Sequence, residues 1–233
     1  MSHPIESSTF ELEQHASLRL ARAAAPGACR LVTAQSSAAV ARLCAALDTA
    51  YDTVAQPQAD APADALAPTH RAEFARLVRA ALAQAAADDT LLNPAQREGS
   101  AQCYRRHLLA ADPDGRYAMA ALVWQPGQAS PVHAHHTWCA YAVLDGTLTE
   151  SLFDWNSALG RATQARTQSR AAGAVSYTRA GLSCIHRLGN AGTRAAVSLH
   201  VYGVAGERIA THVNDLVNVD APMSGACPAL VEH

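Results

Sequence analysis

Charged side chains are scarce in this sequence of 233 residues. Only 16% of the residues are Asp, Glu, Lys or Arg, the formal net charge is −2, and no basic run occurs. A partner rich in phosphate would require a basic surface to neutralise it, so we expect no nucleic-acid partner. The composition is more consistent with the chemistry of a small molecule.

Long apolar runs and a leader-like start are also missing. Residues 1–15 lack a basic segment followed by an apolar one, and no stretch is long and apolar enough to cross a bilayer. Cysteines are few and form no C-x-x-C pair, which in a reducing compartment favours free thiols over a disulfide framework. We therefore expect a cytoplasmic protein without a membrane partner. The cysteines are Cys29, Cys44, Cys103, Cys139, Cys184 and Cys227.

Alanine-rich segments with amphipathic spacing occupy the first hundred residues. Apolar positions recur at helical intervals in residues 10–25, 36–51 and 70–87, which predicts three helices. Residues 56–68 are rich in Pro, Ala and Asp, as is typical of a connecting loop. We expect residues 1–100 to form a helical arm packed on or near the rest of the chain.

Short β-rich segments separated by turn residues replace the helical pattern after that point. Many short strands at regular spacing are typical of a sandwich or of a small barrel with a ligand-holding interior. We expect a mainly β fold in which residues 101–233 form the barrel and the whole chain makes one compact domain. The predicted strands are 117–125, 138–144, 147–153, 174–178, 183–187 and 195–202.

Two histidines, His133 and His135, lie two residues apart within the glycine-bounded segment 127–146. Side chains alternate across a strand, so both imidazoles leave the same face and can bind one ion if a third ligand joins them. His186, in the glycine-bounded segment 173–190, is the candidate for that ligand. Imidazole ligands suit Zn, Cu, Fe and Ni alike, and three of them also describe a catalytic zinc site. An isolated histidine in a β-rich region is usually only a hydrogen-bonded structural residue, and an H-x-H pair alone is weak evidence for a metal.

The spacing of these histidines and glycines resembles the cupin superfamily. Within it, the chain resembles the thiol dioxygenases of the cysteine dioxygenase type. The resemblance implies a cupin double-stranded β-helix, which is a small β-barrel, and an Fe(II) ion held by His133, His135 and His186. The segments that carry it are CYRRHLL (103–109), PVHAHHTWC (131–139), GTLTESLFDW (146–155), IHRLGN (185–190) and SLHVYG (198–203).

The same resemblance implies roles for side chains around the metal. Arg106 would hold the carboxylate of the substrate, since a guanidinium fork matches a carboxylate, with Tyr104 beside it on the same strand face. Ser198, His200 and Tyr202 alternate along one strand and would form a relay that orients the tyrosine hydroxyl toward bound substrate and oxygen. The alternatives are a surface arginine and an ordinary core tyrosine.

Cys139 occupies a position where cupins commonly carry a glutamate ligand. In animal members of the resembled family, the relay tyrosine is covalently joined to a cysteine near the metal. Here the segment between His135 and Cys139 is one residue shorter than in those enzymes. A thioether between Cys139 and Tyr202 is therefore a hypothesis, and a buried free cysteine is its alternative.

The function that the resemblance implies is the iron-dependent oxidation of L-cysteine to cysteine sulfinate, with a small thiol acid and O2 as partners. The first alternative is a 3-mercaptopropionate dioxygenase with the same metal site. Arg106 and Cys139 favour cysteine, whereas Thr137 and Trp138 resemble the mercaptopropionate group. The second alternative is a non-catalytic metal-binding cupin that acts as a sensor or binding module. The sequence leaves the oligomeric state open.

Overall fold

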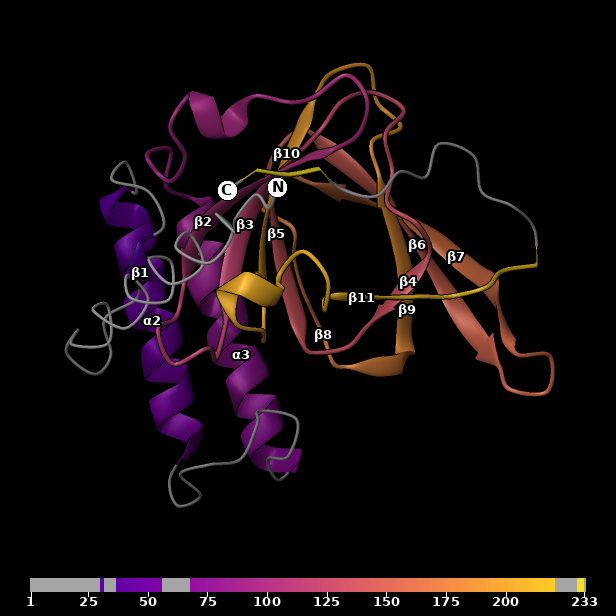
Figure 1. Ribbon diagram of the computed structural model, residues 1–233, viewed down its shortest axis with the longest axis horizontal. Coiled ribbons are helices and arrows are strands. Elements are labelled where there is room, and N and C mark those ends of the chain that lie inside the picture. The colour runs from indigo at the N-terminus through magenta and orange to yellow at the C-terminus, as the bar shows by residue number, and fades with distance from the viewer. Residues whose placement is uncertain (1–29, 32–36, 56–67, 221–229, 233) are drawn as a thin grey trace, which may run out of the picture.

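The structure is a computed structural model that describes residues 30–31, 37–55, 68–220 and 230–232 (Figure 1). The predicted helix 10–25 and the predicted loop, apart from its last residue, lie outside the described residues. The other two predicted helices are confirmed as α2 (Ala38–Ala55) and α3 (Pro68–Ala86).

The described strands form two sheets, and consecutive strands of the barrel mostly alternate between them. The larger sheet has seven strands: β1 (Arg30–Leu31), β2 (Arg105–Ala111), β3 (Ala118–Trp124), β10 (Ala196–Tyr202), β5 (Cys139–Asp145) and β8 (Val175–Thr178) in that order, with β12 (Leu230–Glu232) beside β2. The smaller has five: β11 (Asn214–Leu216), β4 (His133–His135), β9 (Gly181–Gly189), β6 (Thr147–Asn156) and β7 (Arg161–Ala171). The short β12 pairs with β2 in parallel, whereas the strands of the barrel pair antiparallel. This arrangement confirms the predicted cupin double-stranded β-helix.

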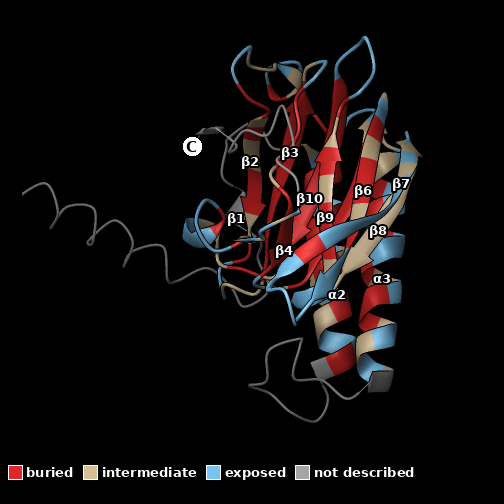
Figure 2. Cartoon of the chain, turned by 90° about the vertical axis from the view of Figure 1, so that its right-hand side faces the viewer, coloured by how far each residue is buried: buried red, intermediate tan, exposed pale blue. Residues whose placement is uncertain are grey.

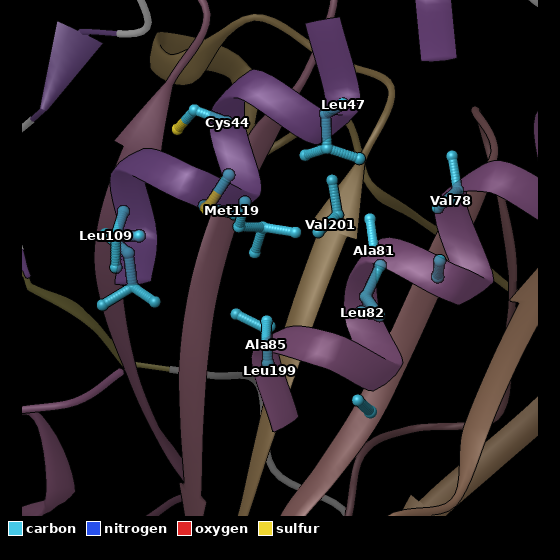
Figure 3. Close-up of a cluster of buried hydrophobic side chains, with 14 of the residues drawn as sticks. Cys44, Leu47, Val78, Ala81, Leu82, Ala85, Leu109, Met119, Leu199 and Val201 are labelled. Atoms are coloured by element: carbon cyan, nitrogen blue, oxygen red, sulfur yellow. The ribbon is translucent and has the colours of Figure 1, made fainter. Parts of the chain in front are cut away.

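Strand β3 shows how the sequence supports a core on both faces of the larger sheet. All of its side chains are buried. Met119, Ala121 and Val123 belong to the cluster that packs against α2 and α3, whereas Leu122 and Trp124 belong to the cluster inside the barrel. The helices thus cover the outer face of the larger sheet, and Figure 2 shows the mostly buried, red strands in front of α2 and α3, whose surfaces are partly exposed. Figure 3 shows the contact between helices and sheet.

Phe74 of α3 connects both helices to the barrel. Its ring is fully buried and meets the rings of Tyr51 on α2 and Trp138 beside β5 edge-on, with centroids 4.8 and 5.3 Å away. We expect Phe74→Ala to lower the free energy of unfolding by about 3–5 kcal/mol because the cavity opens between helices and sheet.

Urea unfolding of this variant, followed by fluorescence and by circular dichroism, measures the effect. Arg79→Ala on the exposed side of α3 is the matched control and should cost less than about 0.5 kcal/mol. Separate transitions for the two signals, or an unchanged midpoint for Phe74→Ala, would contradict this packing role.

Each strand predicted from the sequence is present, but several strands were missed, and β7 is the longest of them. Its side chains are mostly exposed, and it lies beside β6 at the edge of the smaller sheet. An edge strand with little buried surface lacks the apolar alternation by which strands are recognised. This strand carries Arg161, Arg166 and Arg170, and charged side chains discourage edge-to-edge pairing.

One expectation about the cysteines is wrong. Cys103 is disulfide-bonded, whereas the cysteine spacing favoured free thiols. Cys44, Cys139 and Cys184 are free. Neither described helix combines the length and hydropathy needed to cross a bilayer. The cytoplasmic location stays a prediction.

Candidate metal centre

The three histidines expected to bind a metal come together inside the barrel. His133 and His135 lie on β4, and His133 is the direct cross-strand partner of His186 on β9. One ring nitrogen from each lies within 4.8 Å of the others, and all three side chains are buried. The β4–β9 pairing thus supplies three converging imidazoles from two short segments.

Two of these rings are oriented by acceptors at Nδ1. His133 Nδ1 lies 2.9 Å from the carbonyl oxygen of Pro131, and His186 Nδ1 lies 2.9 Å from Glu150 Oε1. Neither acceptor carries a proton to give, so Nδ1 must be the donor in both cases. The lone pair of each ring is therefore left on Nε2, where a metal can use it.

His135 is oriented in the same way through a longer contact. Its Nδ1 lies 3.5 Å from Thr178 Oγ1, and that hydroxyl donates its own proton to the carbonyl oxygen of Cys139 at 3.2 Å. The threonine oxygen is then an acceptor for His135, which again leaves Nε2 unprotonated. All three rings thus offer the nitrogen that metal ligation requires.

Burial keeps the imidazoles of His133 and His135 neutral. Desolvation lowers the pKa of His133 to about 3, with the neighbouring His186 adding to the effect. It also lowers the pKa of His135 well below its usual value, and the other two histidines contribute. Neutral imidazole is the form that ligates a metal, so little proton release would accompany metal binding at neutral pH.

Glu150 on β6 was missed as a site residue. Its carboxylate is buried, accepts from His186 and receives a second hydrogen bond of 2.7 Å from Gln168 Nε2. Burial alone would raise the pKa of Glu150, but the His186 and Gln168 contacts lower it below its usual value. One feature of the sequence could have identified it: Glu150 lies two residues after Leu148 on the same strand, so both side chains point to the inward face. A carboxylate behind a histidine ligand fixes its orientation and raises its basicity.

Removing this charge tests that role. We expect Glu150→Gln to weaken metal binding by about 10- to 100-fold, because the amide still accepts from His186 but no longer makes the ring more basic. Competition with a chelator measures the affinity. Asp154→Asn, an exposed change on the same strand, is the control. Equal affinities in the two variants would show that Glu150 does not support the metal.

The predicted relay is assembled on β10. Ser198 Oγ lies 2.9 Å from His200 Nε2, and Tyr202 Oη lies 3.2 Å from His200 Nδ1. All three side chains are buried. Burial lowers the pKa of His200 and raises that of Tyr202 above its usual value, so both groups are neutral at physiological pH.

Arg106 is a buried cation for which the described part of the chain provides no acidic partner. Its side chain is 4% exposed, Nη1 donates to the carbonyl oxygen of Ile209 at 3.1 Å, and Nε has no hydrogen-bond partner among the described residues. Its guanidinium carbon lies 5.9 Å from the ring centroid of Tyr202. A buried charge without a counter-ion is costly, so this position favours an anionic ligand.

One pocket brings these groups together. Seven of the nine predicted site residues line it; Ser198 lies behind His200 and Cys139 lies outside the lining. Trp124 and Asn214 are among the lining residues that the sequence analysis did not identify. The full lining is Tyr104, Arg106, Leu122, Trp124, Ser130, His133, His135, His186, Leu188, His200, Tyr202 and Asn214.

Cys139 on β5 is the direct cross-strand partner of Tyr202 on β10. Its thiol is free and buried, and burial raises its pKa above the usual value. The thiol is therefore protonated at neutral pH.

The chain is similar to a known family and to several solved structures. The sequence profile of the family described as cysteine dioxygenase type I matches residues 99–211. Among solved structures, TT1209 from Thermus thermophilus is 18% identical, with a TM-score of 0.39 over 48% of this chain and 96% of that one. Oxalate decarboxylase from Bacillus subtilis is 24% identical, with a TM-score of 0.32 over 39% of this chain and 22% of that one.

Proposed function

We propose that this protein is an iron-dependent thiol dioxygenase that converts L-cysteine to cysteine sulfinate; the match of residues 99–211 to the cysteine dioxygenase type I family supports the proposal. The observation that carries the proposal is the buried Arg106, which faces the same pocket as the three imidazoles of His133, His135 and His186. One pocket therefore offers a site for a carboxylate and a site for a metal.

The histidines suit a divalent metal. Three neutral ligands leave the full dipositive charge on the ion, which favours a bound thiolate over the thiol. His133, His135 and His186 would hold Fe(II), which when bound would supply a site for the thiolate and for the activation of O2. Imidazole ligands also suit zinc, so the choice of iron rests on the family.

The side chains of the pocket would orient the substrate. Arg106 would bind the carboxylate through its guanidinium fork, which lies near the ring of Tyr202. Tyr104 lines the pocket with it. Tyr202, held by His200, would direct its hydroxyl toward the reacting atoms.

A 3-mercaptopropionate dioxygenase is the second candidate, and one observation favours it. No Asp or Glu occurs among the pocket-lining residues, so no carboxylate in the described lining would hold the ammonium group of cysteine. A substrate without an amine needs no such partner. Under our proposal the amine is instead a second donor to the metal.

Dioxygen uptake by the iron-loaded protein tests the proposal. Cysteine and 3-mercaptopropionate are compared in parallel, and the sulfinate product of each is quantified. Uptake matched by cysteine sulfinate supports the proposed substrate. Preferential turnover of 3-mercaptopropionate would contradict cysteine as the substrate and support the 3-mercaptopropionate dioxygenase instead. Full iron occupancy without uptake of O2 would instead support a metal-binding cupin that acts as a sensor or binding module.

We also propose that Cys139 and Tyr202 form a thioether during turnover. Their direct pairing across β5 and β10 supports it. The step joins the sulfur to a ring carbon and breaks the S–H bond and one ring C–H bond, and the two protons and two electrons released pass to O2, which is reduced to hydrogen peroxide. Peptide mapping after turnover tests it: a linked peptide lacking two hydrogens is expected, and two unmodified peptides would contradict it.

A further inference from the structure

We propose that Trp124 is a positioning residue that sets the direction of the hydrogen-bond chain ending at Tyr202, so that the Tyr202 hydroxyl donates its proton into the pocket. The inference deepens the proposed function and rests on it, because it states which hydrogen-bonding role the tyrosine presents to a bound substrate. Trp124 acts through Ser198 and His200.

The first link is the contact between Trp124 and Ser198. The indole Nε1 lies 2.9 Å from Ser198 Oγ, and an indole can only donate. Ser198 is fully buried, with an exposed fraction of 0%, so water does not compete for its hydroxyl. Within the described residues, its other hydrogen-bond partner is His200 Nε2 at 2.9 Å. The serine proton must therefore go to His200.

The second link follows from the chemistry of a neutral imidazole. When Nε2 accepts the serine proton, the ring carries its own proton on Nδ1. That nitrogen lies 3.2 Å from Tyr202 Oη, so His200 donates to the tyrosine oxygen. The ring also stacks on Tyr141, with centroids 5.4 Å apart, which restricts the rotation that would exchange the two nitrogens.

The last link determines whether the Tyr202 hydroxyl donates or accepts a hydrogen bond in the pocket. Its oxygen accepts from His200, and the nearby Arg106 guanidinium has only donors, so neither neighbour takes the phenol proton. That proton is left for a group in the pocket that the tyrosine lines. If the chain ran in the opposite direction, Tyr202 would donate to His200 and present only lone pairs to the substrate.

The position of Trp124 suits this role. It lies at the end of β3 with 1% exposure, and its ring stacks on Tyr104 with centroids 4.3 Å apart and planes inclined by 20°. The stack holds the indole in place while its N–H reaches Ser198. Phenylalanine can keep the stack but lacks the donor, so Trp124→Phe separates the two contributions.

The protonation of His200 is the direct test. Histidine ¹⁵N NMR of the zinc-loaded, diamagnetic protein distinguishes a protonated Nδ1 from a protonated Nε2, and loss of signals in His200→Gln assigns the ring. We expect Nδ1–H in the unmodified protein, and a shift to a mixture of tautomers or to Nε2–H in Trp124→Phe. Ser198→Ala should give the same shift. Trp155→Phe, which alters a half-exposed tryptophan, should not.

Two results would overturn the inference. One is an Nε2–H tautomer in the unmodified protein, which is decisive even if Trp124→Phe does not fold. The other is an unchanged Nδ1–H signal in folded Trp124→Phe. Because neither measurement requires turnover, failure of this inference is distinguishable from failure of the proposed dioxygenase activity.

Discussion

Replacing His186 by alanine is expected to abolish activity by removing one of three metal ligands. Metal affinity should fall by more than about 100-fold. Mutating a residue that only hydrogen-bonds a metal ligand already weakens metal binding by about 10- to 100-fold, and losing the ligand itself should cost more. The variant also removes the 2.9 Å hydrogen bond from His186 to the buried Glu150 carboxylate, which should cost roughly 1.5–3 kcal/mol of unfolding free energy. Metal analysis after gel filtration and urea unfolding measure the two effects.

His136 provides a matched control for this experiment. It directly follows the ligand His135, but its side chain is exposed and outside the pocket. His136→Ala should therefore retain metal and activity. If His186→Ala binds metal as tightly as His136→Ala, the assignment of the three-histidine centre is wrong.

The second large effect is expected from Arg106. Arg106→Gln removes the buried charge that we assign to the substrate carboxylate, and losing one side of such a pair costs roughly 2–5 kcal/mol. The value of kcat/KM for the thiol acid should therefore fall by about 30-fold to several thousand-fold. Arg106→Lys should recover only part of it, because an ammonium lacks the planar fork. Steady-state kinetics with sulfinate detection measure the loss.

A substrate without a carboxylate makes the assignment specific. Cysteamine turnover, however slow, should be the same in Arg106→Gln as in the unmodified protein, since it has no group for the guanidinium to bind. Arg105→Gln is the control, because this side chain lies on the other face of β2, near Glu98 at 3.8 Å. An equal loss on cysteamine and cysteine would indicate a structural role for Arg106.

The parts of the site that the sequence predicted are those encoded by short spacing. The alternation of His133 and His135 on one strand, and of Ser198, His200 and Tyr202 on another, follows from the geometry of a strand alone. That His186 lies beside His133 and His135 could be expected only through the resemblance to cupins. In the structure, the β4–β9 pairing places His186 directly opposite His133.

The missed residues are supporting groups whose partners are distant in sequence. Glu150 and His186 are 36 positions apart, and Trp124 and Ser198 are 74 apart. Neither pair follows a local period, and an inward-facing glutamate or tryptophan is equally compatible with a structural core. The disulfide of Cys103 was missed for a similar reason, because cysteine spacing alone does not determine pairing.

The most direct test of the account is the oxidation of cysteine by the iron-loaded protein under ¹⁸O2. The account predicts that both oxygen atoms added to the sulfur come from O2, and that this labelled sulfinate accounts for the cysteine consumed. Label in neither oxygen, or oxidation to cystine alone, would contradict the claim that this site is a thiol dioxygenase.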